Sequence, residues 1–364
     1  MAARGKDAKR SSKRACFFIR GVVTGDRIGG KIKTMTENIR KNCELLIQNR
    51  DQIKSVLPWD GGLMHLACAG IYVMKDKNVD GDVLEQSKRL LKEKLGIFSN
   101  FRGTARSPIA AMMAVSGSPE RTLDNGIVVY ELLKKDFWSS AYLPLAAMVI
   151  AQMVEPSAYG EVAGRTRKIY ERMKAEHPFL TSSEDSAFCA MSALSDRSDD
   201  ALISDMEACY KLLKPEFFSG NAVQSLSHVL SLCEGTPEEK CRKTLELFNN
   251  LKDAGRKYGT EYELPTLGIF AMADVASGQI VQEMLEIDEW LSGQKGFGML
   301  GSINKKQRLM YAGMLAQKEH VRADVVQTAA VNSTVALIVA QEAAMCAVVA
   351  ASSAAASASN SSSG

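Results

Sequence analysis

The chain has 364 residues, of which 46% are apolar and 24% are charged, and its formal net charge is +3. This composition is typical of a globular protein with a packed core and excludes a chain that is disordered throughout. Residues 1–34 carry ten Lys and Arg against two Asp, so the rest of the chain has 35 basic and 40 acidic side chains. That mildly acidic body lacks the charge expected of a nucleic-acid-binding domain.

Residues 1–34 form a basic segment with no helical periodicity. Blocks of like charge are usually solvated tails, so we expect a disordered tail here. An arm that binds nucleic acid or a membrane surface is the functional alternative. Helical periodicity begins just after Met35, so the pattern fits a translation start at either Met1 or Met35.

The eight cysteines include no CxxC pair, and several fall on apolar helical faces. A free cysteine on such a face behaves as a small hydrophobic residue. Reduced thiols are typical of a cytoplasmic protein. The apolar run at 15–19 is too short for a secretory signal.

Residues 201–236 predict two short helices joined by a turn at 217–220. Leu202, Cys209 and Leu213 fall on one face at a period near 3.6, which is the pattern of an amphipathic helix. The second helix is rich in small and apolar residues. The stretch therefore predicts a helical hairpin.

The same hairpin pattern recurs about every 40 residues from residue 36 onward. Each second helix opens on a large apolar residue, and an aromatic residue lies in the loop before it. The apolar residues are Leu66, Ile109, Leu145, Phe188, Leu226, Leu267 and Leu309. The aromatic residues are Trp59, Phe98, Phe137, Phe179, Phe217, Tyr258 and Phe297.

The first helix of each unit is amphipathic, and the second is apolar nearly all round and must be buried. This pattern predicts an all-α domain at 35–320, built as an array of about seven helical hairpins. Such an array is an α-solenoid, or an α/α toroid if its curvature completes a ring. Proline and glycine agree with the predicted starts and ends of the second helices. These residues are Pro108, Pro144 and Pro265 at the starts and Gly117, Gly235 and Gly278 at the ends.

Residues 321–351 are rich in Ala and Val and predict a C-terminal capping helix packed on the last hairpin. The run is long enough to suggest a membrane anchor, but polar residues interrupt it, and charge near a bilayer centre is costly. Residues 352–364 are rich in Ser and Ala and predict a disordered tail.

The loop around Asp76, Asn78 and Asp80 matches part of a calcium-binding EF-hand loop. The position that should carry a bidentate Glu is Ser87, which removes two oxygen ligands. The alternative is a turn between hairpins, in which Asp82 caps the following helix.

The motif HPFLTSSED at 177–185 predicts overlapping helix capping boxes. In the functional interpretation, Glu184 and Asp185 reach the concave face of the array beside His177. Gln224 and His228 lie in the motif QSLSH on the next apolar helix, where buried polar groups need partners.

Arg102 lies in a loop between aromatic residues and could clamp a carboxylate or another anion. The alternative is an ordinary arginine at a helix end. His320 is expected to be exposed.

No nucleotide-binding glycine loop, nucleophile elbow or zinc motif is present. The sequence therefore predicts no cofactor and leaves a weak calcium loop as its only metal candidate.

Five segments occur in a fixed order. They are FSNFRG (98–103), YLPLAAMVIA (142–151), HPFLTSSED (177–185), QSLSH (224–228) and KGFG (295–298). Together they resemble a bacterial family catalogued as a domain of unknown function, number four thousand and three. The resemblance covers about residues 36–316. It implies a bacterial, cytoplasmic setting and no particular activity.

Two functions follow from these patterns. The first is a non-enzymatic helical-repeat scaffold that binds a protein or peptide on its concave face, without nucleic acid and without a membrane. The second is an enzyme or small-ligand binder with a polar site formed by Arg102, Glu184, Asp185, Gln224 and His228. The sequence does not specify an oligomeric state.

Overall fold

The computed structural model describes residues 35–97, 99–103, 105–135, 137, 142–182, 185–297 and 301–325, the last five by their backbone alone. Every regular element in these ranges is a helix, as the sequence predicts. Within them, no helix combines the length and apolar character needed to cross a bilayer. The predicted tails at 1–34 and 352–364, and the capping helix beyond residue 325, lie outside the described residues.

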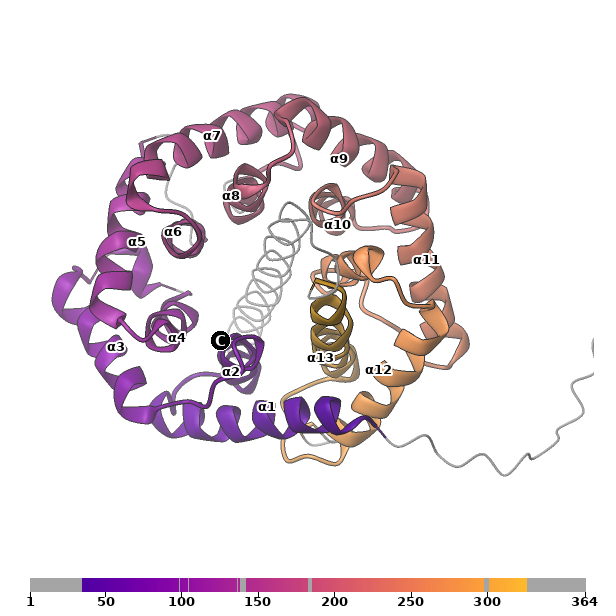
Figure 1. Cartoon of the computed structure of the whole chain (residues 1–364), viewed down its shortest axis with the longest axis horizontal. Coiled ribbons are helices and arrows are strands. Elements are labelled where there is room, and N and C mark those ends of the chain that lie inside the picture. The colour runs from indigo at the N-terminus through magenta and orange to yellow at the C-terminus, as the bar shows by residue number, and fades with distance from the viewer. Residues whose placement is uncertain are drawn as a thin grey trace, which may run out of the picture. The chain divides into compact units, whose positions relative to one another are not determined.

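The helices form two concentric layers (Figure 1). The outer layer contains α1 (Glu37–Val56), α3 (Gly81–Lys94), α5 (Pro119–Leu133), α7 (Tyr159–Glu176), α9 (Asp199–Leu213), α11 (Pro237–Asp253) and α12 (Ser277–Ser292). The inner layer contains α2 (Gly62–Met74), α4 (Arg106–Ser116), α6 (Leu143–Met153), α8 (Ser186–Leu194), α10 (Gly220–Ser231), the 3-10 helix η4 (Leu264–Met272) and α13 (Lys305–Val325). Two short 3-10 helices, η1 (Asn100–Arg102) and η2 (Pro156–Ala158), lie in the loops.

The last helices pack against the first. Helix α13 contacts α1, and so does α12. Lys318 Nζ donates to Asn42 Oδ1 at 2.9 Å, and Asn38 is hydrogen-bonded to Glu319. Helices α1 to α13 therefore close on themselves, and we call this part of the molecule the ring.

Helices α13 and α2 lie side by side and run in the same direction. Near the starts of both helices, Tyr311 Oη donates to Leu63 O at 3.3 Å. Near their later ends, Lys318 Nζ donates to Val73 O at 2.5 Å. The two inner helices are therefore parallel, as expected when each inner helix follows an equivalent loop from the outer layer. The loops that lead into the inner helices thus lie on one side of the ring, which we call the N-terminal rim.

Cationic side chains cap the other ends of the inner helices. The last carbonyls of a helix have no partner within it and carry the negative end of its dipole. The contacts run from Lys77 to Val115 O (2.8 Å), from Arg165 to Ala193 O (3.0 Å) and from Lys243 to Ala271 O (3.3 Å). These cations join neighbouring elements and satisfy polar groups that burial would otherwise leave unpaired.

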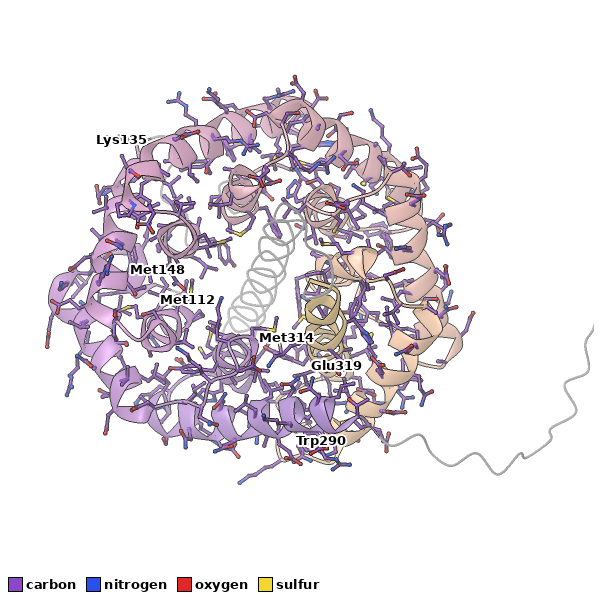
Figure 2. All side chains as sticks on the ribbon, in the orientation of Figure 1. Met112, Lys135, Met148, Trp290, Met314 and Glu319 are labelled. Carbon is purple, nitrogen blue, oxygen red and sulfur yellow. The ribbon has the colours of Figure 1, made fainter. Side chains whose placement is uncertain are left out.

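Apolar side chains fill the space between the two layers, and some reach the inner side of the ring. Met112 and Met314 lie inside the circle of outer helices, whereas Lys135 and Trp290 lie at its outer edge (Figure 2). The predicted loop aromatics divide into two groups. Phe137, Phe217, Tyr258 and Phe297 are buried, while Trp59 and Phe179 are exposed. Phe98 lies outside the described residues.

Several local predictions are wrong. His320 is buried, and its Nε2 pairs with the Glu283 carboxylate. Gly278 lies in the first turn of the outer helix α12, not at the end of an inner helix.

The loop before α3 also differs from its prediction. Asp80, not Asp82, is the N-cap residue, because its Oδ1 accepts from the backbone N–H groups of Asp82 (3.0 Å) and Val83 (3.1 Å). The helix starts earlier than predicted, which places Asp82 inside its first turn.

Candidate functional site

The motifs HPFLTSSED and QSLSH meet at the N-terminal rim. Gln224 is buried in α10, and its Nε2 donates to Thr181 Oγ1 at 2.7 Å. Thr181 in turn donates to Met173 O at 3.3 Å. Asp185 Oδ2 accepts from the backbone N–H of Ser182 at 2.8 Å, which is half of the predicted capping box. These bonds tie the loop before α8 to the neighbouring inner helix. Glu184 lies outside the described residues.

Two histidines lie beside this network. His228 is 2% exposed, its ring lies 5.4 Å from that of Phe188, and its Nδ1 has no hydrogen-bond partner among the described residues. His177 stacks on Tyr210 with ring centroids 4.4 Å apart. Its Nε2 lies 2.7 Å from Glu207 Oε1, although the contact lacks hydrogen-bond geometry.

Burial, with a smaller contribution from nearby His177, lowers the pKa of His228 from 6.5 to about 3. A neutral imidazole enclosed by protein is a packing group at neutral pH, since a general acid or base needs access to its substrate. The structure thus brings His177, Asp185, Gln224 and His228 to one place. The hydrogen bonds of Gln224 and Asp185 there stabilise the loop before α8.

We expect His228 to make the fold less stable in acid. Its pKa is lower in the folded than in the unfolded chain. Between about pH 6.5 and pH 3, His228 is therefore protonated in the unfolded chain and neutral in the folded chain. From pH 7 to pH 5 this should remove about 2 kcal/mol from the free energy of unfolding. Urea unfolding at both pH values, for the wild type and His228→Gln, measures the difference. Equal losses in the two proteins would contradict the prediction.

The predicted calcium loop uses its carboxylates for other purposes. Asp80 caps α3, and Asp76 is paired with Lys318. Across the described ranges, no group of three or more His, Cys, Asp or Glu side chains could hold a metal ion. Asp76 and Asp80 therefore have structural contacts in the turn between hairpins.

Arg102 lies elsewhere on the N-terminal rim. It ends η1, which precedes α4, and α6 lies between α4 and α8 (Figure 1). Arg102 Nη1 donates to Leu95 O at 3.2 Å. The structure therefore does not bring Arg102 to the cluster around Gln224 and His228.

Arg102 lines a cleft of about 360 Å³ between the first two hairpins. Trp59 is 95% exposed and Ile97 is 71% exposed, and both line this cleft. Lys92 and Arg106 add positive charge, and Arg106 Nη2 lies 3.2 Å from Asp60 Oδ1. We call this feature the rim cleft.

A second hollow of about 670 Å³ lies next along the rim. It is lined by Phe101, Tyr130 and Phe137, which are all buried. The rim cleft is the stronger candidate for a binding site, because its apolar side chains Trp59 and Ile97 are exposed.

The sequence analysis lists Trp59 as one of the loop aromatics and does not predict its exposure. A signal was available, because Pro58 precedes it and the run Asp60-Gly61-Gly62 follows it, which is typical of a projecting turn. Exposed tryptophan is uncommon, and tryptophan is enriched among residues that dominate binding interfaces.

Comparison with known proteins gives one family. Residues 49–343 match the model described as "Protein of unknown function (DUF4003)". Neither the curated proteins nor the solved structures contain a match. The matched region covers more than half of the chain and extends past the last described helix.

Proposed function

The chain belongs to the DUF4003 family, and from this premise we propose a non-enzymatic scaffold that binds an acidic peptide of a protein partner in the rim cleft. Its architecture is an α/α toroid of seven helical hairpins. The family's description assigns no activity, so the proposal depends on the geometry of the ring. The observation that carries it is the pair of exposed apolar side chains, Trp59 and Ile97, beside four cations.

Charge in the rim cleft favours an anionic ligand. Four cations line the cleft together with one carboxylate, that of Asp60; they are Lys88, Lys92, Arg102 and Arg106. An arginine guanidinium has five N–H donors and can hold a carboxylate with two of them. A peptide Asp or Glu is the matching group in a protein partner.

The apolar groups of the cleft define the second part of the ligand. Trp59 and Ile97 expose surface that becomes buried when an apolar side chain packs against it, which is favourable by about 25 cal/mol per Å². A volume of about 360 Å³ lies at the small end of the range for ligand pockets. The cleft therefore suits a short segment with one apolar side chain next to an acidic one.

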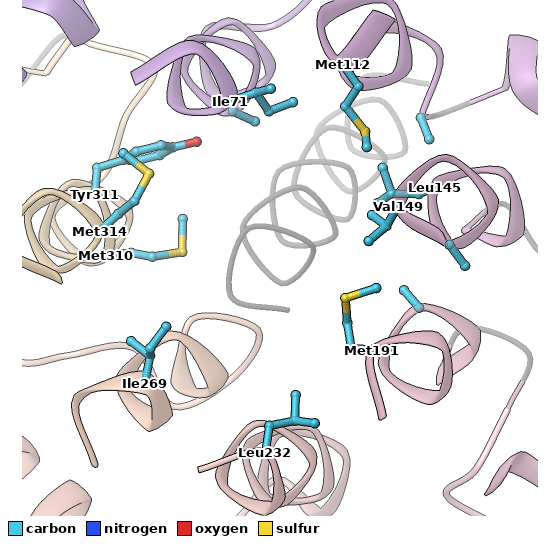
Figure 3. Close-up of a cluster of buried hydrophobic side chains, with 14 of the residues drawn as sticks. Ile71, Met112, Leu145, Val149, Met191, Leu232, Ile269, Met310, Tyr311 and Met314 are labelled. Atoms are coloured by element: carbon cyan, nitrogen blue, oxygen red, sulfur yellow. The ribbon is translucent and has the colours of Figure 1, made fainter. Parts of the chain in front are cut away.

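The proposed binding surface is the rim cleft, whereas the sequence predicts binding on the concave face. In a closed ring the concave face is the inner wall, where apolar side chains such as Met191 and Leu232 point inward (Figure 3) and are buried. The rim offers exposed groups instead. Six buried free cysteines in the described ranges support a reducing, cytoplasmic location.

Selection of short random peptides displayed on phage tests this function. We expect the selected peptides to carry Asp or Glu beside an apolar residue. Their binding should weaken at least about tenfold in both Trp59→Ala and Arg102→Glu, which corresponds to about 1.4 kcal/mol.

Phe218→Ala is the matched control, since Phe218 is an exposed loop aromatic that does not line the cleft. It should bind the selected peptides as the wild type does. Peptides that lack acidic residues, or that bind Trp59→Ala and Arg102→Glu unchanged, would overturn the proposal.

A further inference from the structure

Two exposed phenylalanines lie on neighbouring loops of the N-terminal rim. Phe179, in the loop before α8, is 100% exposed, and Phe218, in the loop before α10, is 97% exposed. Neither side chain lines the rim cleft or the second hollow. We call residues 174–180 and 214–220 the aromatic patch. Large apolar side chains that come together on a surface mark a site of interaction.

The two loops of the aromatic patch contact each other. The backbone of Gly220 lies against the side chain of Leu180. The hydrogen bond described above also ties the loop before α8 to α10. Lys214 Nζ donates to Phe218 O at 3.2 Å, which holds the second loop onto the end of α9. The backbones that carry Phe179 and Phe218 are therefore held beside each other before any partner binds.

Charges of both signs precede the two exposed rings in the same order. In each loop a lysine is followed two residues later by a glutamate, and then by the exposed phenylalanine. These residues are Lys174, Glu176 and Phe179 in the first loop and Lys214, Glu216 and Phe218 in the second. Three of the four charged side chains are exposed, and that of Lys214 is half-buried. The four charges cancel, so they favour neither a strongly acidic nor a strongly basic partner.

A second copy of the chain matches this surface. Most homo-oligomers of soluble proteins have two-fold symmetry, and a two-fold contact joins the same surface of both subunits. The exposed rings of one copy then pack on those of the other. With the second copy turned by a half rotation, the lysines of each patch can lie opposite the glutamates of its partner. A surface with one sign of charge would instead repel its own copy.

The size of the aromatic patch suits a weak, reversible contact. A buried phenylalanine removes about 150–250 Å² from water, so the two rings provide about 300–500 Å² in each copy. A stable interface of standard size buries about 800 Å² in each partner. The rings therefore supply about half of that area, and the polar loop residues around them supply the remainder. We expect a dissociation constant in the micromolar range.

We propose that the aromatic patch is the interface of a homodimer. Helices α8 and α10 lie across the ring from α2 (Figure 1), so this interface is separate from the rim cleft. The dimer carries two rim clefts and can hold two peptides of one partner at once, which raises the overall affinity for a partner with repeated motifs. The inference rests on the exposed rings and their charges, and it does not depend on the peptide proposed for the rim cleft.

Sedimentation velocity tests the proposal on the full-length chain, at protein concentrations from well below to well above the micromolar range. We expect a reversible dimer in the wild type. Phe179→Asp/Phe218→Asp should raise its dissociation constant at least about tenfold, because exposed rings of this kind become the anchors of an interface. Both side chains are exposed, so this variant should unfold in urea as the wild type does.

Trp59→Asp is the matched control, since Trp59 is an exposed aromatic in another loop of the same rim. It should dimerise as the wild type does. A wild type that stays monomeric at every concentration would assign the aromatic patch to a different partner and overturn the proposal. A dimer that Phe179→Asp/Phe218→Asp leaves unchanged would overturn it as well.

A charge exchange tests the two-fold arrangement. Glu176→Lys/Glu216→Lys leaves lysines alone in the patch, and Lys174→Glu/Lys214→Glu leaves glutamates alone. Each variant should be monomeric at concentrations where the wild type dimerises, and an equimolar mixture of the two should dimerise again. Dimers of both variants that are as stable as those of the wild type would show that a different surface pairs.

Discussion

Asp205→Ala should lower the free energy of unfolding by about 3 to 5 kcal/mol. Asp205 in α9 is 5% exposed and forms an ion pair with Lys240 of α11, which is 1% exposed. Arg197 also pairs with this carboxylate. Without the carboxylate, the Lys240 ammonium stays buried with the Cys233 carbonyl oxygen, 3.2 Å away, as its remaining bond partner. An uncompensated buried charge is among the most costly changes in a protein core. Urea unfolding measures the loss.

Two controls separate the stranded charge from other effects of the substitution. Asp205→Leu combined with Lys240→Met removes both charges and should recover most of the loss, because apolar groups of similar volume can replace a buried ion pair. Glu171→Ala breaks the exposed pair with Arg167, and should cost at most about 0.5 kcal/mol. A loss in Asp205→Ala as small as that in Glu171→Ala would contradict the prediction.

Lys318→Met should lower the free energy of unfolding by about 2 to 4 kcal/mol, since it leaves buried acceptors unpaired. Lys318 is buried where α13 meets α1 and α2, and donates to Asn42 Oδ1 and to Val73 O. It also pairs with Asp76. Methionine keeps much of the volume but none of these bonds. Because Lys318 joins the two ends of the ring, hydrogen exchange should accelerate most in α1, α2 and α13.

Lys77→Met is the matched control. Lys77 makes the same kind of bond to the carbonyl of Val115 at the end of α4, but its side chain is exposed and links adjacent hairpins. Its replacement should cost less than about 1 kcal/mol. Faster exchange that is spread evenly over the ring in Lys318→Met would show that this residue does not hold the closure.

The helices themselves are well predicted by local patterns. The apolar stripe of Leu202, Cys209 and Leu213 predicts an amphipathic helix, and α9 covers Asp199–Leu213 with these three side chains buried. A period of 3.6 residues is set by the helix alone, so neighbouring residues are enough to reveal it.

Closure of the ring could not be predicted in the same way. It depends on contacts such as the bond between Lys318 and Asn42, which are 276 residues apart in sequence. No local pattern encodes the small rotation between hairpins that decides between an open and a closed array. Lys318 and Lys240 also look like ordinary surface lysines in the sequence. Both side chains are buried by neighbouring hairpins, which a local sequence pattern does not reveal.

The candidate site shows a similar division. Gln224 and His228 stand out as polar residues on an apolar helix, and the structure places both in the core beside the loop at 177–182. The rim cleft escaped notice because Trp59 occupies the same place in its repeat as buried aromatics such as Phe217. Equivalent positions in the sequence differ in exposure because the loops around them differ.

The closed ring is the architecture on which the proposed scaffold rests, and cross-linking tests it most directly. In a Cys16→Ser/Cys346→Ser background, cysteines would replace Asn38 of α1 and Glu319 of α13, whose side chains are hydrogen-bonded. A short bis-maleimide should join them within one chain in high yield, as peptide mass spectrometry would detect. The pair Val128→Cys and Glu319→Cys, on separate parts of the ring, should not be joined. A yield for the first pair no higher than that for the second would contradict a closed ring.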